Sequence, residues 1–241
     1  MSQPARLIFY TNRNCPYAQR SWIALRELQV NFVYQDIELG KDNKTDWFSR
    51  LNPNGTVPVI QHGETVVYES LVVNEYLQEV FGNERVQLLP ATAGERAYAR
   101  ILISRCDAKF VKLSYTYLSH KDETGDRSKI EDEQLRQQLE AELSFLERAI
   151  GKFKGSYFLG NTFSLVDIAY IPFFERMLVA LPTWKGFDLY SLNLPHLKHW
   201  LKVMENRDSY QGTRMTPEKI KEVYSRFLGM DYFKRAGIAA S

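Results

Sequence analysis

Cysteine is scarce in this chain: its 241 residues include only two, Cys15 and Cys106. Two thiols cannot form the disulfide framework that stabilises many small secreted domains, and reducing compartments keep thiols free. We therefore expect a cytoplasmic protein. The usual partner of a redox-active cysteine is also missing, because Ala18 stands where a Cys-x-x-Cys motif has its second thiol. A disulfide cycle between neighbouring thiols is thus excluded at Cys15, whose sulfur would have to exchange with a thiol from elsewhere.

The sequence also lacks a strong net charge and long apolar runs. A formal net charge of +2 gives no electrostatic basis for nucleic acid or an anionic membrane as a partner. No segment has the length of a membrane span, and the first residues lack the apolar stretch of a signal peptide. The four histidines are scattered, and the close pair His196 and His199 has no cysteine or carboxylate set beside it. We therefore expect no metal site.

What the chain does have is enough apolar material for two modest cores, since 44% of its residues are hydrophobic. Its first part alternates short apolar runs with amphipathic stretches, which predicts a small α/β layer domain over residues 1–83. A polar stretch with Pro90 predicts a linker over 84–92. The expected strands are 7–10, 32–37, 57–61 and 65–68, and the expected helices are 16–28, 46–51 and 70–81.

From residue 93 to 241 the apolar residues recur with the period of a helix, which predicts an all-helical second domain. Ser164 and Asp167 form a Ser-x-x-Asp motif before an apolar run, as in a capping box. We interpret both residues as structural, because such a motif holds a helix start and carries out no chemistry. The expected helices are 93–119, a stripe within 130–150, 164–180, 195–206 and 217–228.

Cys15 is the strongest candidate for a reactive residue. It follows an expected strand and precedes Pro16, which is well placed in the first turn of a helix because its missing N–H has no partner there. A thiol at a helix N-terminus faces unpaired N–H groups and the positive end of the helix dipole, which favour the nucleophilic thiolate. A free cysteine is otherwise most often a small buried apolar residue, and Cys106, in the middle of an expected helix, fits that alternative.

The Val57-Pro58 pair is a second candidate. Proline cannot donate to a strand ladder and is tolerated at the first residue of a strand. Its place near a reactive cysteine suggests a cis peptide bond, which would turn the Val57 N–H and C=O toward the backbone of a ligand. An ordinary turn proline is the alternative.

The Glu69-Ser70 pair lies where a strand is expected to end and a helix to begin. A serine there caps the helix, and its hydroxyl and the neighbouring N–H groups can hold a carboxylate. Glu69 offers an acceptor for an ammonium group. The pair therefore suits both charged groups of an α-amino acid, although simple capping explains most such pairs.

Together these motifs resemble the cytosolic glutathione transferases. The resemblance rests on Cys15-Pro16-Tyr17-Ala18 at a strand-to-helix turn, Val57-Pro58, Glu69-Ser70 and Ser164-x-x-Asp167, in the same order along nearly the whole chain. The cysteine resembles that of the omega class, with the lambda class close behind. The resemblance implies a thioredoxin-like N-terminal domain, an all-helical C-terminal domain and a homodimer.

The resemblance also implies roles for individual residues. Cys15 would form a mixed disulfide with glutathione, the cosubstrate, and Tyr17 would pack beside the sulfur. Val57, before a cis Pro58, would pair with the cysteinyl backbone of glutathione. Glu69 and Ser70 would hold its γ-glutamyl end and Lys44 its glycyl carboxylate. The second substrate would lie between the domains, against Lys112, Tyr115, Tyr170, Phe174 and Trp184, with Tyr224 and Met230 from the C-terminal segment.

The activity implied by the resemblance follows from the cysteine. A Cys thiolate attacks glutathionylated substrates, which predicts thioltransferase, deglutathionylase and dehydroascorbate-reductase-like activity, with weak conjugation of small electrophiles. Alternatives are a non-catalytic glutathione-binding or regulatory protein on the same fold, an isomerase or a glutathionyl-quinone reductase. A plain redoxin is less consistent with the long helical domain.

Overall fold

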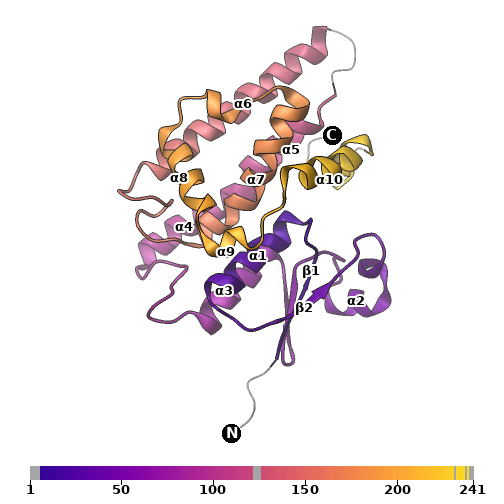
Figure 1. The fold of residues 1–241 in the computed structure, drawn as a ribbon, viewed down its shortest axis with the longest axis vertical. Coiled ribbons are helices and arrows are strands. Elements are labelled where there is room, and N and C mark those ends of the chain that lie inside the picture. The colour runs from indigo at the N-terminus through magenta and orange to yellow at the C-terminus, as the bar shows by residue number, and fades with distance from the viewer. Residues whose placement is uncertain (1–5, 122–125, 231, 237, 239–241) are drawn as a thin grey trace. The chain divides into compact units, whose positions relative to one another are not determined.

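The computed structural model describes residues 6–121, 126–230, 232–236 and 238. The chain divides into two compact units (Figure 1). The sheet unit holds the chain up to Ala91 together with Arg207–Arg214, and the helical unit holds Thr92–Asn206 and the chain from Met215 onward.

A mixed β-sheet forms the centre of the sheet unit, with the strand order β2-β1-β3-β4. Strand β1 pairs in parallel with β2 and antiparallel with β3, which in turn pairs antiparallel with β4. Phe9 of β1 lies opposite Tyr34 on one side and Ile60 on the other. The strands are β1 (Leu7–Thr11), β2 (Val33–Asp36), β3 (Val59–His62) and β4 (Thr65–Tyr68).

Helices cover both faces of this sheet, and in Figure 1 the sheet lies between the pair α1 and α3 and the short helix α2. Helices α1 and α3 pack against each other, and their buried faces carry Ile23, Leu25, Val73 and Leu77. The helices of the unit are α1 (Pro16–Glu27), α2 (Asp46–Leu51), α3 (Ser70–Phe81) and α9 (Asp208–Gln211), with a 3₁₀ turn at Asp42–Lys44.

The segment Arg207–Arg214 belongs to the sheet unit although it lies within the predicted helical domain. Arg207 forms an ion pair with Glu27 at the end of α1. The Gln19 side chain on α1 donates hydrogen bonds to the backbone oxygen and the hydroxyl of Thr213, each 3.2 Å long. One ion pair and two hydrogen bonds thus attach the residues on either side of α9 to α1, and no local sequence pattern indicates these contacts.

The predicted strand over 57–61 begins two residues later than expected, at Val59. Pro58 has no N–H to donate to the ladder, and the Val57–Pro58 peptide bond is cis. Val57 and Pro58 therefore form a connection that leads into β3.

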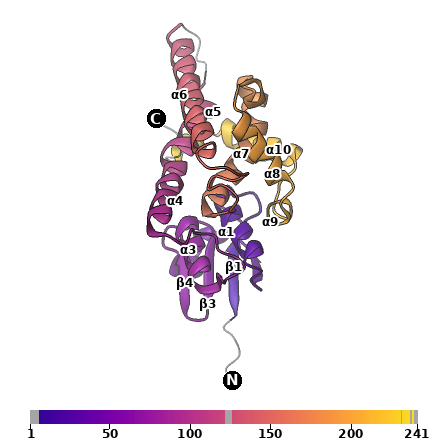
Figure 2. The same cartoon turned by 90° about the vertical axis from the view of Figure 1, so that its left-hand side faces the viewer.

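The helical unit consists of helices packed around α7 (Figure 2). Helix α7 contacts α4, α5 and α10, and α6 contacts α5 and α8. The stretch predicted as one helix over 93–119 is continuous, with a π-helical segment at Cys106–Val111 between α4 and α5. The helices are α4 (Ala93–Arg105), α5 (Lys112–Ser119), α6 (Asp126–Ile150), α7 (Leu165–Lys185), α8 (Pro195–Glu205), α10 (Pro217–Gly229) and α11 (Tyr232–Arg235).

Helix α7 is longer than its periodicity predicts. It continues past residue 180 and through Pro182 to Lys185. Gly186 follows as the C-cap, and its φ of 61° is the left-handed conformation typical of that position. A thioredoxin-like unit with the order βαβαββα and an all-helical unit confirm the predicted fold class.

Asp167 holds the start of α7 from inside the core. Its side chain is fully buried and accepts hydrogen bonds from the Ser164 N–H at 2.9 Å and the Trp200 Nε1–H at 2.8 Å. The Phe158 N–H and the Ser164 hydroxyl also donate to it. Burial raises the pKa of Asp167 to about 6, while these hydrogen bonds act in the opposite direction. Ser164 and Asp167 form a complete capping box.

Replacement of Asp167 by alanine leaves the N–H groups of Phe158, Ser164 and Trp200 buried without an acceptor. Because each unsatisfied buried donor costs about 1–3 kcal/mol, we expect the free energy of unfolding to fall by at least about 3 kcal/mol in urea denaturation. Ser164→Ala, which removes one hydroxyl, should cost only about 1 kcal/mol. Normal stability of Asp167→Ala with a loss of turnover would contradict the structural role.

Candidate functional site

Cys15 lies at the N-terminus of α1. It is the N-cap residue, with φ −82° and ψ 118°, and Pro16 is the first helical residue. Extended geometry at this position and the missing N–H of proline define where a helix begins. The thiol is half-buried, and it packs against an apolar cluster formed by Ala18, Ile37, Phe48, Val57 and Val59.

The Cys15 sulfur also lies close to the connection before β3. Its distance to the Val57 carbonyl oxygen is 3.7 Å, which is within reach of a weak S–H hydrogen bond. These residues are 42 positions apart in the sequence. The fold therefore brings together two of the residues that the sequence singled out, with backbone polar groups of Val57 beside the thiol.

Glu69 has an unusual backbone conformation. Its φ is 68°, a value that non-glycine residues rarely adopt and that costs about 1–3 kcal/mol. The side chain is exposed, and its carboxylate accepts a 2.9 Å hydrogen bond from the Asn54 Nδ2. Such strained residues concentrate at binding sites, where the surrounding structure fixes them. Asn54 is thus a partner of the site that the sequence did not indicate.

Ser70 does not cap α3, which corrects our expectation. Glu69 is the N-cap residue and Ser70 is the first residue of the helix, with no capping hydrogen bond from a side chain. The Ser70 hydroxyl is buried and accepts a 3.3 Å hydrogen bond from Arg20 Nη1. Glu69, with its positive φ, takes the N-cap position, so Ser70 lies within the first turn of the helix and its hydroxyl contacts a buried guanidinium from α1.

Two further predicted residues lie in the sheet unit without a contact that tests their roles. Lys44 ends the 3₁₀ turn before α2 and is exposed. The ring of Tyr17 lies 5.2 Å from the guanidinium of Arg20. Their proposed contacts with glutathione stay predictions.

Several residues predicted to line a second-substrate pocket lie in the core of the helical unit. Tyr170 and Phe174 have no exposed surface, and the Tyr170 hydroxyl donates to the Leu102 carbonyl at 2.9 Å. Tyr115 is 2% exposed, with its hydroxyl 2.7 Å from that of Tyr224. Core aromatic residues and pocket walls share the same helical spacing, so periodicity could not distinguish them. We therefore do not carry these residues into the proposed site.

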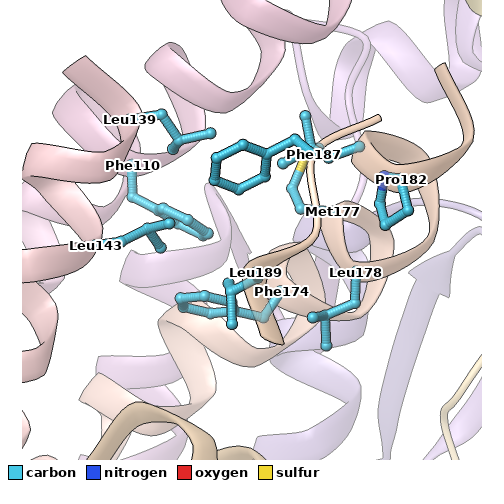
Figure 3. A pocket seen from close by; sticks show the side chains of 10 residues that line it. Phe110, Leu139, Leu143, Phe174, Met177, Leu178, Pro182, Phe187 and Leu189 are labelled. Carbon is cyan, nitrogen blue, oxygen red and sulfur yellow. The ribbon is translucent and has the colours of Figure 1, made fainter. Parts of the chain in front are cut away.

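Phe174 also borders an apolar cavity of about 10 Å³ (Figure 3). That volume is close to the minimum for one water molecule and far below that of a ligand pocket. The remaining candidates differ in exposure: Lys112 and Met230 are exposed, and Trp184 is half-buried. The residues around the cavity are Phe110, Leu139, Leu143, Phe174, Met177, Leu178, Leu181, Pro182, Phe187 and Leu189.

Within the described part of the chain, no group of three or more His, Cys, Asp or Glu side chains is arranged to hold a metal ion. Among the same residues, no helix is both long and apolar enough to cross a membrane.

The fold and the position of Cys15 define a class of protein: a thioredoxin-like unit with a cysteine at the start of its first helix, joined to an all-helical unit. Comparison with known families agrees. The profile of the glutathione S-transferase N-terminal domain matches residues 14–80, and that of the C-terminal domain matches residues 104–202.

Individual relatives are similar over nearly the whole chain. Glutathione S-transferase L3 of Arabidopsis thaliana is 34% identical over 221 residues, covering 90% of this chain and 86% of that protein. Glutathione S-transferase omega-1 of Sus scrofa is 29% identical, covering 91% and 85%. The crystal structure of glutathione transferase Omega 3C from Trametes versicolor has a TM-score of 0.77 at 27% identity, covering 95% and 93%. The chain belongs to the glutathione S-transferase family, in its omega- and lambda-like group.

The two cysteines differ in access, which gives a direct prediction. Cys106 is fully buried, and its thiol lies 3.3 Å from the Ala169 carbonyl oxygen. We expect iodoacetamide to modify Cys15 in the folded protein and to reach Cys106 only after denaturation, because alkylation requires an accessible thiolate. Mass analysis of the two cysteine-containing peptides measures this. Equal labelling of both thiols in the native state would contradict the placement.

Proposed function

We propose that this protein is a glutathione-dependent thiol transferase and reductase in which Cys15 is the nucleophile. The observation that carries the proposal is the half-buried thiol at the N-cap of α1, 3.7 Å from the Val57 carbonyl. A helix N-terminus stabilises a thiolate through its N–H groups and dipole. We expect the pKa of the Cys15 thiol to lie below that of free cysteine.

The reaction consists of two thiol–disulfide exchanges. The Cys15 thiolate attacks the glutathione sulfur of a mixed disulfide between glutathione and a substrate. A sulfur–sulfur bond forms to Cys15, the substrate sulfur leaves as a thiolate and takes a proton from solvent. The thiolate of a second glutathione then attacks the same glutathione sulfur, which releases oxidised glutathione and regenerates the Cys15 thiolate. In the net reaction, the substrate thiol is released and one reduced glutathione is oxidised, because the other half of the oxidised glutathione comes from the mixed disulfide of the substrate.

A second cysteine on α1 is not required in this scheme. Ala18, at the third position after Cys15, is buried and has no thiol to resolve the mixed disulfide. The second glutathione supplies that thiol instead. Dehydroascorbate reduction and weak conjugation of small electrophiles belong to the same proposal.

Glutathione would lie along the edge formed by the starts of α1, β3 and α3. The backbone of Val57 offers a donor and an acceptor to the cysteinyl part of the tripeptide, in the connection that ends at Pro58. The exposed carboxylate of Glu69 suits the ammonium group of the γ-glutamyl end. The first turn of α3, from Ser70, suits its carboxylate, because N–H groups at a helix start bind anions.

Lys44 and Tyr17 complete the proposed glutathione site, with Lys44 near the glycyl carboxylate and Tyr17 beside the sulfur. We further propose a cytoplasmic homodimer, as is usual in the family. A small electrophilic or glutathionylated compound is the proposed second substrate.

Exposure to oxidised glutathione tests this proposal. We expect one glutathione adduct per chain, mapped to Cys15 by mass spectrometry and removed by excess reduced glutathione, because only an accessible thiolate exchanges rapidly. Cys15→Ala should form no adduct, and the matched variant Cys106→Ala should form it as the wild type does.

Two results would contradict the proposal. One is an adduct that persists in excess reduced glutathione. The other is retention of the protein on immobilised glutathione without reduction of any glutathionylated substrate, which would favour the non-catalytic alternative.

A further inference from the structure

Asn12 is the first residue of the loop that joins β1, which ends at Thr11, to α1, which begins at Pro16. Its side-chain Oδ1 accepts a 3.0 Å hydrogen bond from the Asn14 N–H, which closes a turn of the kind that asparagine favours. Its backbone carbonyl accepts a 3.1 Å hydrogen bond from the Cys15 N–H. The side chain and the backbone of Asn12 thus fix the conformation of the loop up to Cys15.

The same side chain also ties this loop to the sheet. Its Nδ2 donates a 2.9 Å hydrogen bond to the Ile37 carbonyl, just beyond the end of β2. The Ile37 N–H in turn donates to the Thr11 carbonyl at 2.8 Å. Ile37 is buried and belongs to the apolar cluster against which Cys15 packs. Asn12 therefore fixes the loop relative to the surface on which the sulfur rests.

The connection between α2 and β3, which passes the Cys15 sulfur at Val57, is held by an asparagine side chain in a similar way. Asn52 Oδ1 accepts from the Asn54 N–H at 3.0 Å, and its Nδ2 donates to the Thr56 carbonyl at 2.8 Å. Thr56 directly precedes Val57, whose carbonyl meets the Cys15 sulfur. Two loops that converge on one thiol are thus each held by an asparagine amide, and Asn12 holds the one that carries the nucleophile.

We propose that Asn12 is a positioning residue for Cys15. Its amide holds the loop in which Cys15 adopts the extended N-cap conformation directly before Pro16, the first residue of α1. When the amide is removed, the loop is free to relax and the thiol loses part of the stabilisation of its ionised form. The proposal rests on the proposed function only in taking Cys15 as the nucleophile.

The test measures the rate constant for alkylation of Cys15 by iodoacetamide, followed on the Cys15 peptide, at mildly acidic and at alkaline pH. In Asn12→Ala we expect the rate at about pH 6 to fall about fivefold, the factor that corresponds to one typical hydrogen bond. The rate at alkaline pH should equal that of the wild type, because the thiol is fully ionised there in both proteins. A loss of stability alone would not lower the alkylation rate at acidic pH while leaving the rate at alkaline pH unchanged.

Two variants serve as comparisons. Asn12→Ser keeps an oxygen that can accept from the Asn14 N–H but is too short to reach Ile37, so its rate at acidic pH should lie between those of the wild type and Asn12→Ala. Asn83→Ala removes a similar turn in another part of the sheet unit, where Oδ1 accepts from the N–H groups of Arg85 and Val86 at 2.9 and 3.1 Å. It should behave as the wild type.

The proposal is overturned if Asn12→Ala and Asn12→Ser, both folded by circular dichroism, keep the wild-type ratio of acidic to alkaline rates. It is also overturned if Asn83→Ala lowers the ratio as much as Asn12→Ala does. A lowered ratio in Asn12→Ala, combined with no adduct from oxidised glutathione in the wild type, would support the role of Asn12 while the proposed function fails.

Discussion

The chemistry proposed for this protein depends on the environment of one sulfur atom. The Cys15 thiol lies at the first turn of α1, where helix N–H groups and the dipole favour the thiolate. It also rests on an apolar cluster and lies 3.7 Å from the Val57 carbonyl oxygen, which can only accept a hydrogen bond, and this environment favours the neutral thiol. The half-buried position limits the second effect, because the sulfur keeps contact with solvent. The balance of these two effects sets the nucleophilicity of Cys15, and the proposed exchange with glutathione follows from it.

The sheet unit is organised so that distant segments meet at this sulfur. The parallel pairing of β1 with β2 and the antiparallel pairing with β3 place the ends of three segments beside one another. Side-chain amides then hold the irregular backbone between the regular elements, as Asn12 and Asn52 do. The strained conformation of Glu69 is fixed in the same region, between β4 and α3. The sheet and its helices thus form a rigid scaffold that positions the loops carrying the candidate binding residues.

Much of the fold follows from the sequence, because strand alternation and helical periodicity are local signals. The position of Cys15 was also predictable, since a strand, a cysteine, a proline and a helix follow one another directly. The contact between Cys15 and Val57 depends on the pairing of β1 with β3, a long-range contact that no local sequence pattern indicates. The expected capping of α3 by Ser70 is wrong, because the positive φ that makes Glu69 the N-cap residue has no sequence signal. The sequence analysis does not single out Asn12. An asparagine directly after an expected strand is nevertheless a recognisable turn signal, because its side chain can accept a hydrogen bond from the N–H two residues further on.

The most direct test of the central claim is a pH titration of the ultraviolet absorbance of the thiolate in the wild-type protein, corrected by the same titration of Cys15→Ser. Because the helix N-terminus stabilises the ionised form, we expect the absorbance assigned to Cys15 to develop at a lower pH than that of free cysteine. Development of this absorbance at or above the pH at which free cysteine ionises would contradict the account.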